Sequence, residues 1–179
     1  MAEQNVVLNN LTFELHIQNS EIELRITQLA KLLAKGHSNA NPLFISVLNG
    51  SFIFAADLLR QLDFACEIEF VKVSSYAGTQ STREVKQVLG LSKSIENRTV
   101  IILEDIIDSG LTMDFLLCDL ARFKPKQIEI CTLLLKPEAL KVKLPVNYIG
   151  FEVANDFLVG YGLDYDGHGR NLPHIYKAV

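Results

Sequence analysis

Two adjacent carboxylates and a hydroxyl-rich loop stand together in residues 100–112, which read VIILEDIIDSGLT. Backbone amides, the hydroxyls of Ser109 and Thr112 and the positive end of a following helix would favour a phosphate bound at 108–112. Gly110 lets the backbone approach such a ligand closely. Glu104 and Asp105 would repel a phosphate, so they suit sugar hydroxyls or a metal-bound sugar. Phosphate and sugar side by side indicate a phosphorylated ribose.

The elements around this loop follow from the apolar pattern. Residues 100–103 are continuously apolar, which is typical of a strand buried on both faces, and 113–123 predicts an amphipathic helix. The alternative is a plain strand-turn-helix with a charged strand end.

A second small-residue loop, Asn49-Gly50-Ser51, stands between an apolar strand at 43–48 and a helix at 52–62. Ligands of parallel α/β sheets gather at the carboxyl ends of the strands, so both loops would share one edge. Taken alone, this loop could equally be a simple Asn-Gly turn.

The rest of the chain predicts further alternating elements. Ser20-Glu21-Ile22-Glu23 has the form of a capping box, and apolar residues then recur at helical spacing until Gly36. Further strands are predicted at 11–17, 66–73, 85–89, 127–135 and 148–153. Together these indicate an α/β fold with a mostly parallel sheet flanked by helices, in a single domain covering residues 1–179.

Composition narrows the function. The chain has 179 residues with a formal net charge of −4 and no basic stripe, so nucleic acid is not an expected partner. Cys66, Cys118 and Cys131 have no metal-ligand spacing and are interpreted as buried free thiols. Neither a signal peptide nor a membrane span is recognised, and a cytoplasmic protein without membrane partners is expected.

The run at 100–112 resembles the ribose-phosphate signature of type I phosphoribosyltransferases, and residues 155–165, NDFLVGYGLDY, resemble the base-binding segment of the hypoxanthine-guanine branch. The resemblance extends over about residues 43–176 and is of the bacterial type. It implies the type I phosphoribosyltransferase fold, with a small hood built from about 1–20 and 145–179. Association into a homodimer or homotetramer is also implied.

The resemblance also implies binding roles. Leu48, Asn49 and Gly50 would bind pyrophosphate around a cis peptide at Leu48–Asn49. Many relatives carry a lysine where this chain has Asn49, so that ammonium contact is missing. Arg170 would contact the same pyrophosphate, since a guanidinium suits phosphate oxygens.

Residues 74–83 resemble a flexible lid, in which Ser75 and Tyr76 would close over the reacting centre; a solvated hairpin loop is the alternative. Phe157 would stack on the purine, Leu158 would offer backbone groups to the base edge, and Asp164 would lie beside the base. Lys136, placed after the 127–135 strand, would donate to the exocyclic oxygen of a 6-oxopurine.

The implied activity is 6-oxopurine salvage. A 5-phosphoribosyl group would pass from 5-phosphoribosyl diphosphate to hypoxanthine or guanine, giving the nucleoside monophosphate and pyrophosphate. Asp108, within the 5′-phosphate loop of Asp108, Ser109, Gly110, Leu111 and Thr112, would act as general base at purine N7, unless it only caps its loop. The expected cofactor is Mg²⁺, held by Asp164, Glu104 and Asp105.

Three other interpretations of the function are open. Xanthine, adenine or orotate could be the substrate, although Lys136 and residues 157–165 disfavour the last two. A ligand-sensing regulator on this fold would need a nucleic-acid-binding surface, which the sequence does not show. A generic nucleotide-binding protein of the flavodoxin type would leave the lid and Lys136 unexplained.

Overall fold

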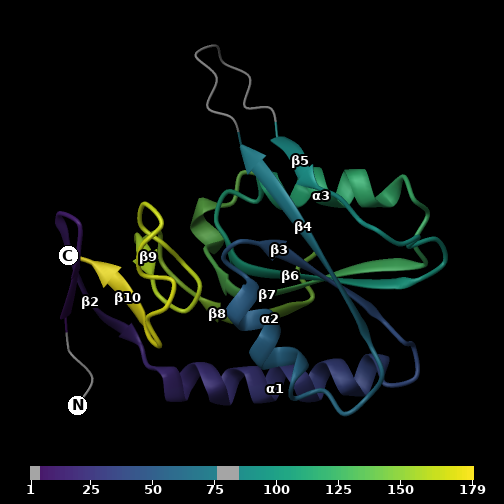
Figure 1. Ribbon diagram of the computed structural model, residues 1–179, viewed down its shortest axis with the longest axis horizontal. Coiled ribbons are helices and arrows are strands. Elements are labelled where there is room, and N and C mark those ends of the chain that lie inside the picture. Colours follow the sequence, from purple (N-terminus) through teal and green to yellow (C-terminus); the bar gives the residue numbers. More distant parts are fainter. Residues whose placement is uncertain (1–4, 76–84) are drawn as a thin grey trace.

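A six-stranded sheet forms the centre of the computed structural model, which describes residues 5–75 and 85–179 (Figure 1). Its strand order is β5-β4-β3-β6-β7-β8. Five strands run parallel and only β5 is antiparallel, beside β4. The strands are β3 (Leu43–Leu48), β4 (Glu67–Ser75), β5 (Val85–Leu89), β6 (Thr99–Ile107), β7 (Gln127–Leu135) and β8 (Tyr148–Glu152). The predicted mostly parallel sheet is therefore confirmed.

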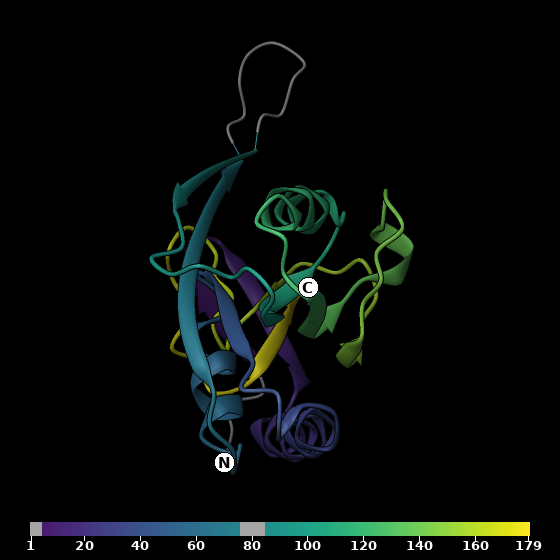
Figure 2. The same cartoon turned by 90° about the vertical axis from the view of Figure 1, so that its right-hand side faces the viewer.

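Helices cover both faces of this sheet (Figures 1 and 2). Phe44, Ile101 and Leu103 pack in one core with α1 (Asn19–His37) and α2 (Phe52–Leu59). Residues in alternate positions, such as Ile45 and Ile102, pack in a second core with α3 (Leu111–Ala121). Because successive side chains of a strand point to opposite faces, burial on both sides requires the continuous apolar runs seen in the sequence.

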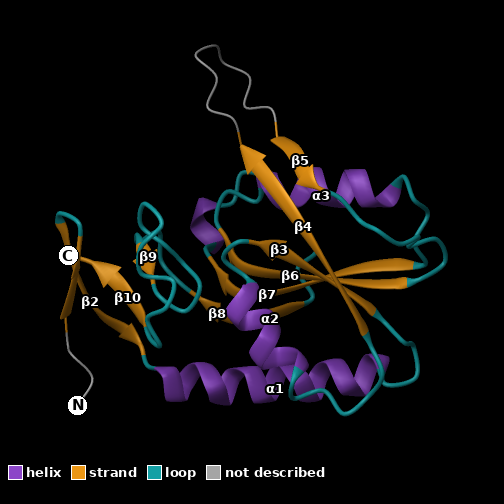
Figure 3. Ribbon diagram, in the orientation of Figure 1, coloured by secondary structure: helices purple, strands orange, loops and turns teal. Residues whose placement is uncertain are grey.

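A second, four-stranded sheet has the order β1-β2-β10-β9 and is set apart from the first in Figure 3. Its strands are β1 (Asn5–Leu8), β2 (Leu11–Ile17), β9 (Leu158–Val159) and β10 (Ile175–Ala178). Phe13, Val159 and Tyr176 form its small core. The hood boundary predicted near residue 145 is too early, because β8 pairs with β7 in the main sheet. The single-domain assignment itself stays a prediction.

Several local predictions differ from the structure. Helix α1 is capped by Gln18, whose N–H donates to Glu21 Oε2 at 3.0 Å, and not by a box beginning at Ser20. The helix also continues past Gly36, since its last residue, His37, is buried and lies 2.9 Å from Glu129 Oε2. The start of the helix is thus set by the local contact between Gln18 and Glu21, and its end is extended by the tertiary contact of His37 with Glu129.

The acidic pair lies inside a strand and not beyond its end. β6 continues to Ile107 because its ladder with β7 extends as far as the Ile107–Leu135 pair. Helix α3 begins at Leu111, directly after Gly110 in the sequence and two residues before its predicted start. Of the predicted buried cysteines, Cys131 is buried and Cys66 is partly so, but Cys118 is exposed on α3. In the described part of the chain, no helix has the length and apolarity that crossing a membrane requires.

Candidate active site

Apart from the lid, the predicted site residues come from four segments that meet near the carboxyl ends of the parallel strands. These are the loop after β3, the end of β6 with its loop, the residue after β7, and the segment around β9. Two cavities lie there, of about 250 Å³ and about 100 Å³. Parallel strands bring their carboxyl ends to a single edge, so residues far apart in sequence converge.

The smaller cavity is formed by the predicted phosphate loop. Its lining includes Glu104, Asp108, Ser109, Gly110 and Thr112. Gly110 has a φ of +80°, and a Cβ there would lie only 2.9 Å from the nearest side-chain atom, on Leu144. The loop thus requires glycine for both its backbone conformation and its packing. It leads directly into α3, whose N-terminal end favours an anion.

The larger cavity gathers all four predicted base-binding residues, Lys136, Phe157, Leu158 and Asp164. Its lining comprises Asp105, Ile106, Asp108, Lys136, Phe157, Leu158, Leu163 and Asp164. Phe157 is 46% exposed, and its ring meets that of Tyr165 edge-on at 5.5 Å between centroids. A supported aromatic ring that is still exposed can stack on a planar ligand.

Lys136 and Asp108 form an ion pair inside this cavity, with Nζ 2.8 Å from Oδ2. The lysine side chain is only 8% exposed, whereas that of Asp108 is 55% exposed. The Lys136 N–H donates to the carbonyl of Ile107, which fastens the end of β7 against the end of β6. A buried ammonium needs a partner, so Lys136 fixes the Asp108 carboxylate at the cavity wall.

The acidic pair on β6 is in an unfavourable electrostatic environment. Burial raises the pKa of Glu104 well above its ordinary value, and the charge of neighbouring Asp105 raises it further. Burial also raises the pKa of Asp105, against the lowering effects of hydrogen bonds and of the Arg170 charge. Two desolvated carboxylates next to each other would be stabilised by a cation or by hydroxyl donors from a ligand.

The loop after β3 packs directly on this pair. The Leu48–Asn49 peptide is cis, as the resemblance implied. A Cβ on Gly50 would lie 1.5 Å from Asp105 Oδ2, so only glycine fits against that carboxylate. At the end of the loop, the buried Ser51 hydroxyl donates to the carbonyl of Val47 at 2.6 Å.

Arg170 and Asp164 also lie together at this edge. Arg170 Nη2 is 2.6 Å from Asp164 Oδ1, and Nη1 donates to the carbonyl of Gly162 at 2.7 Å. The second oxygen of Asp164 accepts the N–H of Gly167 at 2.8 Å. The predicted pyrophosphate-binding arginine therefore holds the predicted metal-binding aspartate in place.

The described structure does not bring the predicted metal ligands together as one group, and it does not test the predicted lid. Among residues 5–75 and 85–179, no three His, Cys, Asp or Glu side chains are grouped closely enough to hold a metal ion. Asp164, Glu104 and Asp105 thus do not form one ligand set. The predicted lid lies outside the described residues: Tyr76 falls there entirely, and of Ser75 only the backbone, which ends β4, is described.

Sequence reasoning also missed some participants. Ile106 and Leu163 line the larger cavity, and Tyr161 bonds to α2 from the loop that carries Asp164. Apolar residues in a strand or loop give no sequence signal that distinguishes a cavity wall from a core. The Gly160-Tyr161-Gly162 triplet was a usable signal, since glycines on either side of an aromatic residue mark an unusual backbone.

Comparisons with known proteins agree with this geometry. Residues 16–166 match the family model described as "Phosphoribosyl transferase domain". The hypoxanthine phosphoribosyltransferase of Escherichia coli K12 is 40% identical over 171 residues, which are 94% of this chain and 96% of that protein. A bifunctional protein TilS/HprT of Listeria monocytogenes is 42% identical over 96% of this chain, and the chain spans only 26% of that longer relative.

A solved structure gives the same result. A hypoxanthine-guanine phosphoribosyltransferase from Bacillus anthracis, with a HEPES molecule in its active site, superposes with a TM-score of 0.88 at 40% identity. The match covers 93% of this chain and 98% of that one. The extent of the family match and these identities show that the chain belongs to the phosphoribosyl transferase family.

Proposed function

We propose that the chain is a 6-oxopurine phosphoribosyltransferase of purine salvage. It transfers the 5-phosphoribosyl group of 5-phosphoribosyl diphosphate to hypoxanthine and guanine, giving IMP or GMP and pyrophosphate. The observation that carries the proposal is the Lys136–Asp108 ion pair, 2.8 Å long, in a cavity that also exposes the Phe157 ring. The names of the E. coli and B. anthracis relatives support the same substrates.

The base pocket explains the choice of a 6-oxopurine. Phe157 stacks on the purine plane, and backbone groups of Leu158 meet its edge. Lys136 donates to the exocyclic oxygen; an ammonium has no acceptor, so an amino group at that position is disfavoured. When the lysine turns to the base, Asp108 is released beside purine N7.

The reaction then proceeds with balanced bonds. Purine N9 attacks the anomeric carbon as the bond from that carbon to the pyrophosphate oxygen breaks. Asp108 takes the N7 proton as general base, which prevents a positive charge from remaining on the product base. The 108–112 loop binds the 5′-phosphate, while Glu104 and Asp105 receive the ribose hydroxyls; this remote binding orients the reacting carbon.

The pyrophosphate leaves toward the 48–50 loop, with Arg170 beside it. The residues present fit Mg²⁺, because the ion prefers oxygen ligands and usually combines one or two carboxylates with substrate oxygens and water. Asp164 would hold the ion on the pyrophosphate side and Glu104 and Asp105 on the ribose side, with substrate oxygens and water as the remaining ligands, because the three carboxylates do not form one group by themselves. When bound, the ion neutralises charge on the departing pyrophosphate.

The remaining predictions belong to this proposal. Ser75 and Tyr76 act as part of a lid that excludes water, the protein is cytoplasmic, and it forms a homodimer or homotetramer. Size-exclusion chromatography with light scattering measures the last of these directly.

An ultraviolet assay tests the activity. Purified protein is mixed with 5-phosphoribosyl diphosphate, magnesium and one base at a time: hypoxanthine, guanine, xanthine or adenine. Turnover of the first two, abolished by a chelator and restored by magnesium, is the expected result. Binding of the diphosphate without turnover of any base would instead favour a ligand-sensing regulator.

A further inference from the structure

Tyr161 lies in the active-site turn but lines neither cavity. Its backbone has a φ of +49°, in the left-handed region that favours glycine, and its side chain is almost fully buried. Its N–H donates to the carbonyl of Leu172 at 2.8 Å. A bulky aromatic residue in this conformation needs compensating contacts, which directs attention to its hydroxyl.

The Tyr161 hydroxyl donates to Asp57 Oδ2 at 2.5 Å, across 104 residues of sequence. Asp57 lies on α2, the helix that follows directly from the pyrophosphate loop at Ser51. Its other oxygen is 3.9 Å from Arg60, whose side chain is 82% exposed, so that ion pair is weak. The tyrosine contact therefore links the turn bearing Asp164 to the helix that fixes the 49–51 loop.

The two loops also touch through backbone alone. A Cβ on Gly162 would lie 2.0 Å from the carbonyl oxygen of Gly50, and Gly50 in turn packs on the Asp105 carboxylate. Arg170 binds the carbonyl of Gly162. Because no side chain separates Gly162 from Gly50, a shift of the Gly162 turn would displace Gly50 and Arg170 together.

We propose that Tyr161 is a positioning residue whose hydrogen bond to Asp57 keeps the 160–164 turn in register with the pyrophosphate loop. Asp164 and Arg170 on one side, and Asn49-Gly50 on the other, then face a single diphosphate. The inference rests on the proposed function and adds to it a residue that acts only through others.

Kinetics of matched variants test this role. Tyr161→Phe keeps the ring and removes the hydrogen bond, and we expect KM for 5-phosphoribosyl diphosphate to rise about tenfold, as for loss of a hydrogen bond to a charged group. KM for hypoxanthine should rise less, by about threefold at most, because Lys136 and Phe157 of the base cavity lie outside the 160–164 turn. Asp57→Ala should match Tyr161→Phe, the double variant should lose no more than either, and Asp57→Asn, which keeps an acceptor, should stay near wild type.

Tyr148→Phe is the control, since its hydroxyl also lies within hydrogen-bond distance of a distant residue, His37 at 3.1 Å, but neither contacts α2 nor lines a cavity of the site. Unchanged KM values in Tyr161→Phe and Asp57→Ala, even with a lower Tm, would overturn the inference, as would an equal rise for both substrates. A wild type without turnover would contradict the proposed function instead. In that case amide hydrogen exchange of ligand-free protein decides: faster exchange at 49–52 and 160–164 in Tyr161→Phe than in Tyr148→Phe supports the link, and equal exchange rejects it.

Discussion

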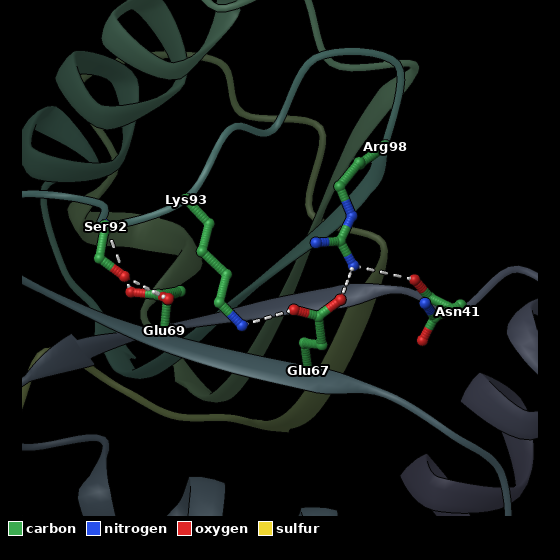
Figure 4. A network of polar contacts seen from close by, with 6 residues as sticks. All are labelled: Asn41, Glu67, Glu69, Ser92, Lys93 and Arg98. Carbon is green, nitrogen blue, oxygen red and sulfur yellow. Dashed lines mark hydrogen bonds and ion pairs between the residues drawn. The ribbon is translucent and has the colours of Figure 1, made fainter.

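Glu67 at the amino end of the parallel sheet and Glu104 at its carboxyl end have pKa values shifted in opposite directions. At the amino end, Glu67 at the start of β4 receives Arg98 Nη2 at 2.6 Å and Lys93 Nζ at 2.8 Å (Figure 4). Arg98 also donates to the Asn41 carbonyl, so the network joins the segments that lead into β3, β4 and β6. Hydrogen bonds from Lys93 and then Arg98 hold the pKa of Glu67 below its ordinary value.

At the carboxyl end, Glu104 is buried beside a second carboxylate, and its pKa is raised. None of the ion pairs within the described part of the chain includes it. Glu67 is thus paired with protein cations, whereas at the carboxyl end Asp108 and Asp164 have such partners but Glu104 has none among the described ion pairs. The amino ends of the strands therefore carry a stabilising charge network, and the carboxyl ends carry the buried carboxylate that lowers stability and is proposed to serve function.

The largest expected effect removes the reactive carboxylate of the ligand-binding end. Asp108→Asn should lower turnover by about 10²–10⁴-fold, the usual contribution of a general base. Stability should fall somewhat, because the buried Lys136 ammonium loses its anionic partner, although the asparagine oxygen can still accept its hydrogen bond. Initial-rate kinetics at saturating substrates and a thermal melt measure the two quantities. Turnover near that of wild type would exclude the general-base role.

The second effect separates base binding from diphosphate binding. Lys136→Ala should raise KM for hypoxanthine roughly 10- to 100-fold, as for loss of a charge-assisted hydrogen bond, and change KM for the diphosphate much less. Lys143→Ala, at an exposed position of the following loop, is the matched control. Equal changes in both KM values would reject the assignment of Lys136 to the base.

The third effect comes from Glu104, whose charged form is disfavoured by burial and by neighbouring Asp105. A folded-state pKa above the unfolded value means that the folded protein binds this proton more tightly, so stability falls as pH rises from the ordinary pKa through the raised one. Glu104→Gln should therefore raise Tm at pH 8 more than at pH 5, by about 2–4 °C for each kcal/mol relieved, while it lowers turnover. Calorimetry in the presence of a chelator makes the measurement. A lower Tm at pH 8 would show that the folded protein stabilises the charged form.

The smallest effect is expected at the amino end, where the sign is reversed. The pKa of Glu67 is lowered on folding, so its contribution is present above the unfolded pKa and is lost as pH falls through the folded one. Glu67→Gln should lower Tm slightly at pH 7, less so in 1 M salt, because salt screens exposed ion pairs. Neither KM should change. A change in KM as large as that of Lys136→Ala would show that the two ends are not independent.

Most of the chemistry could be predicted from contiguous runs of sequence. Residues 100–112 contain the predicted phosphate loop and its strand, and 155–165 contain Phe157 and Asp164 of the larger cavity. Glycine, hydroxyl and carboxylate residues in fixed order restrict backbone and chemistry together, so such runs are informative without a structure. The parallel sheet followed for the same reason, from apolar runs bounded by small-residue loops.

Boundaries and pairings were less predictable. Helix α1 passes Gly36 because His37 finds partners on β7 and β8, and β6 outlasts its apolar run because β7 pairs with it. A capping residue or a strand end depends on free-energy differences of about 1 kcal/mol, which a tertiary contact easily overrides. The predicted metal ligands are likewise not gathered into one group in the described residues, where Arg170 lies on Asp164.

The sequence by itself determined which groups are available: a glycine- and hydroxyl-rich loop, two adjacent carboxylates, a third carboxylate at the start of the loop, a lysine and an aromatic ring. Only the tertiary structure decided how they are paired. It pairs Lys136 with Asp108 in an ion pair and packs Gly50 between Asp105 and Gly162. It also brings the Tyr161 hydroxyl into hydrogen-bond contact with Asp57. Each of these contacts joins residues from different strands or loops, and their distances depend on how the sheet and its loops pack, which no local pattern encodes.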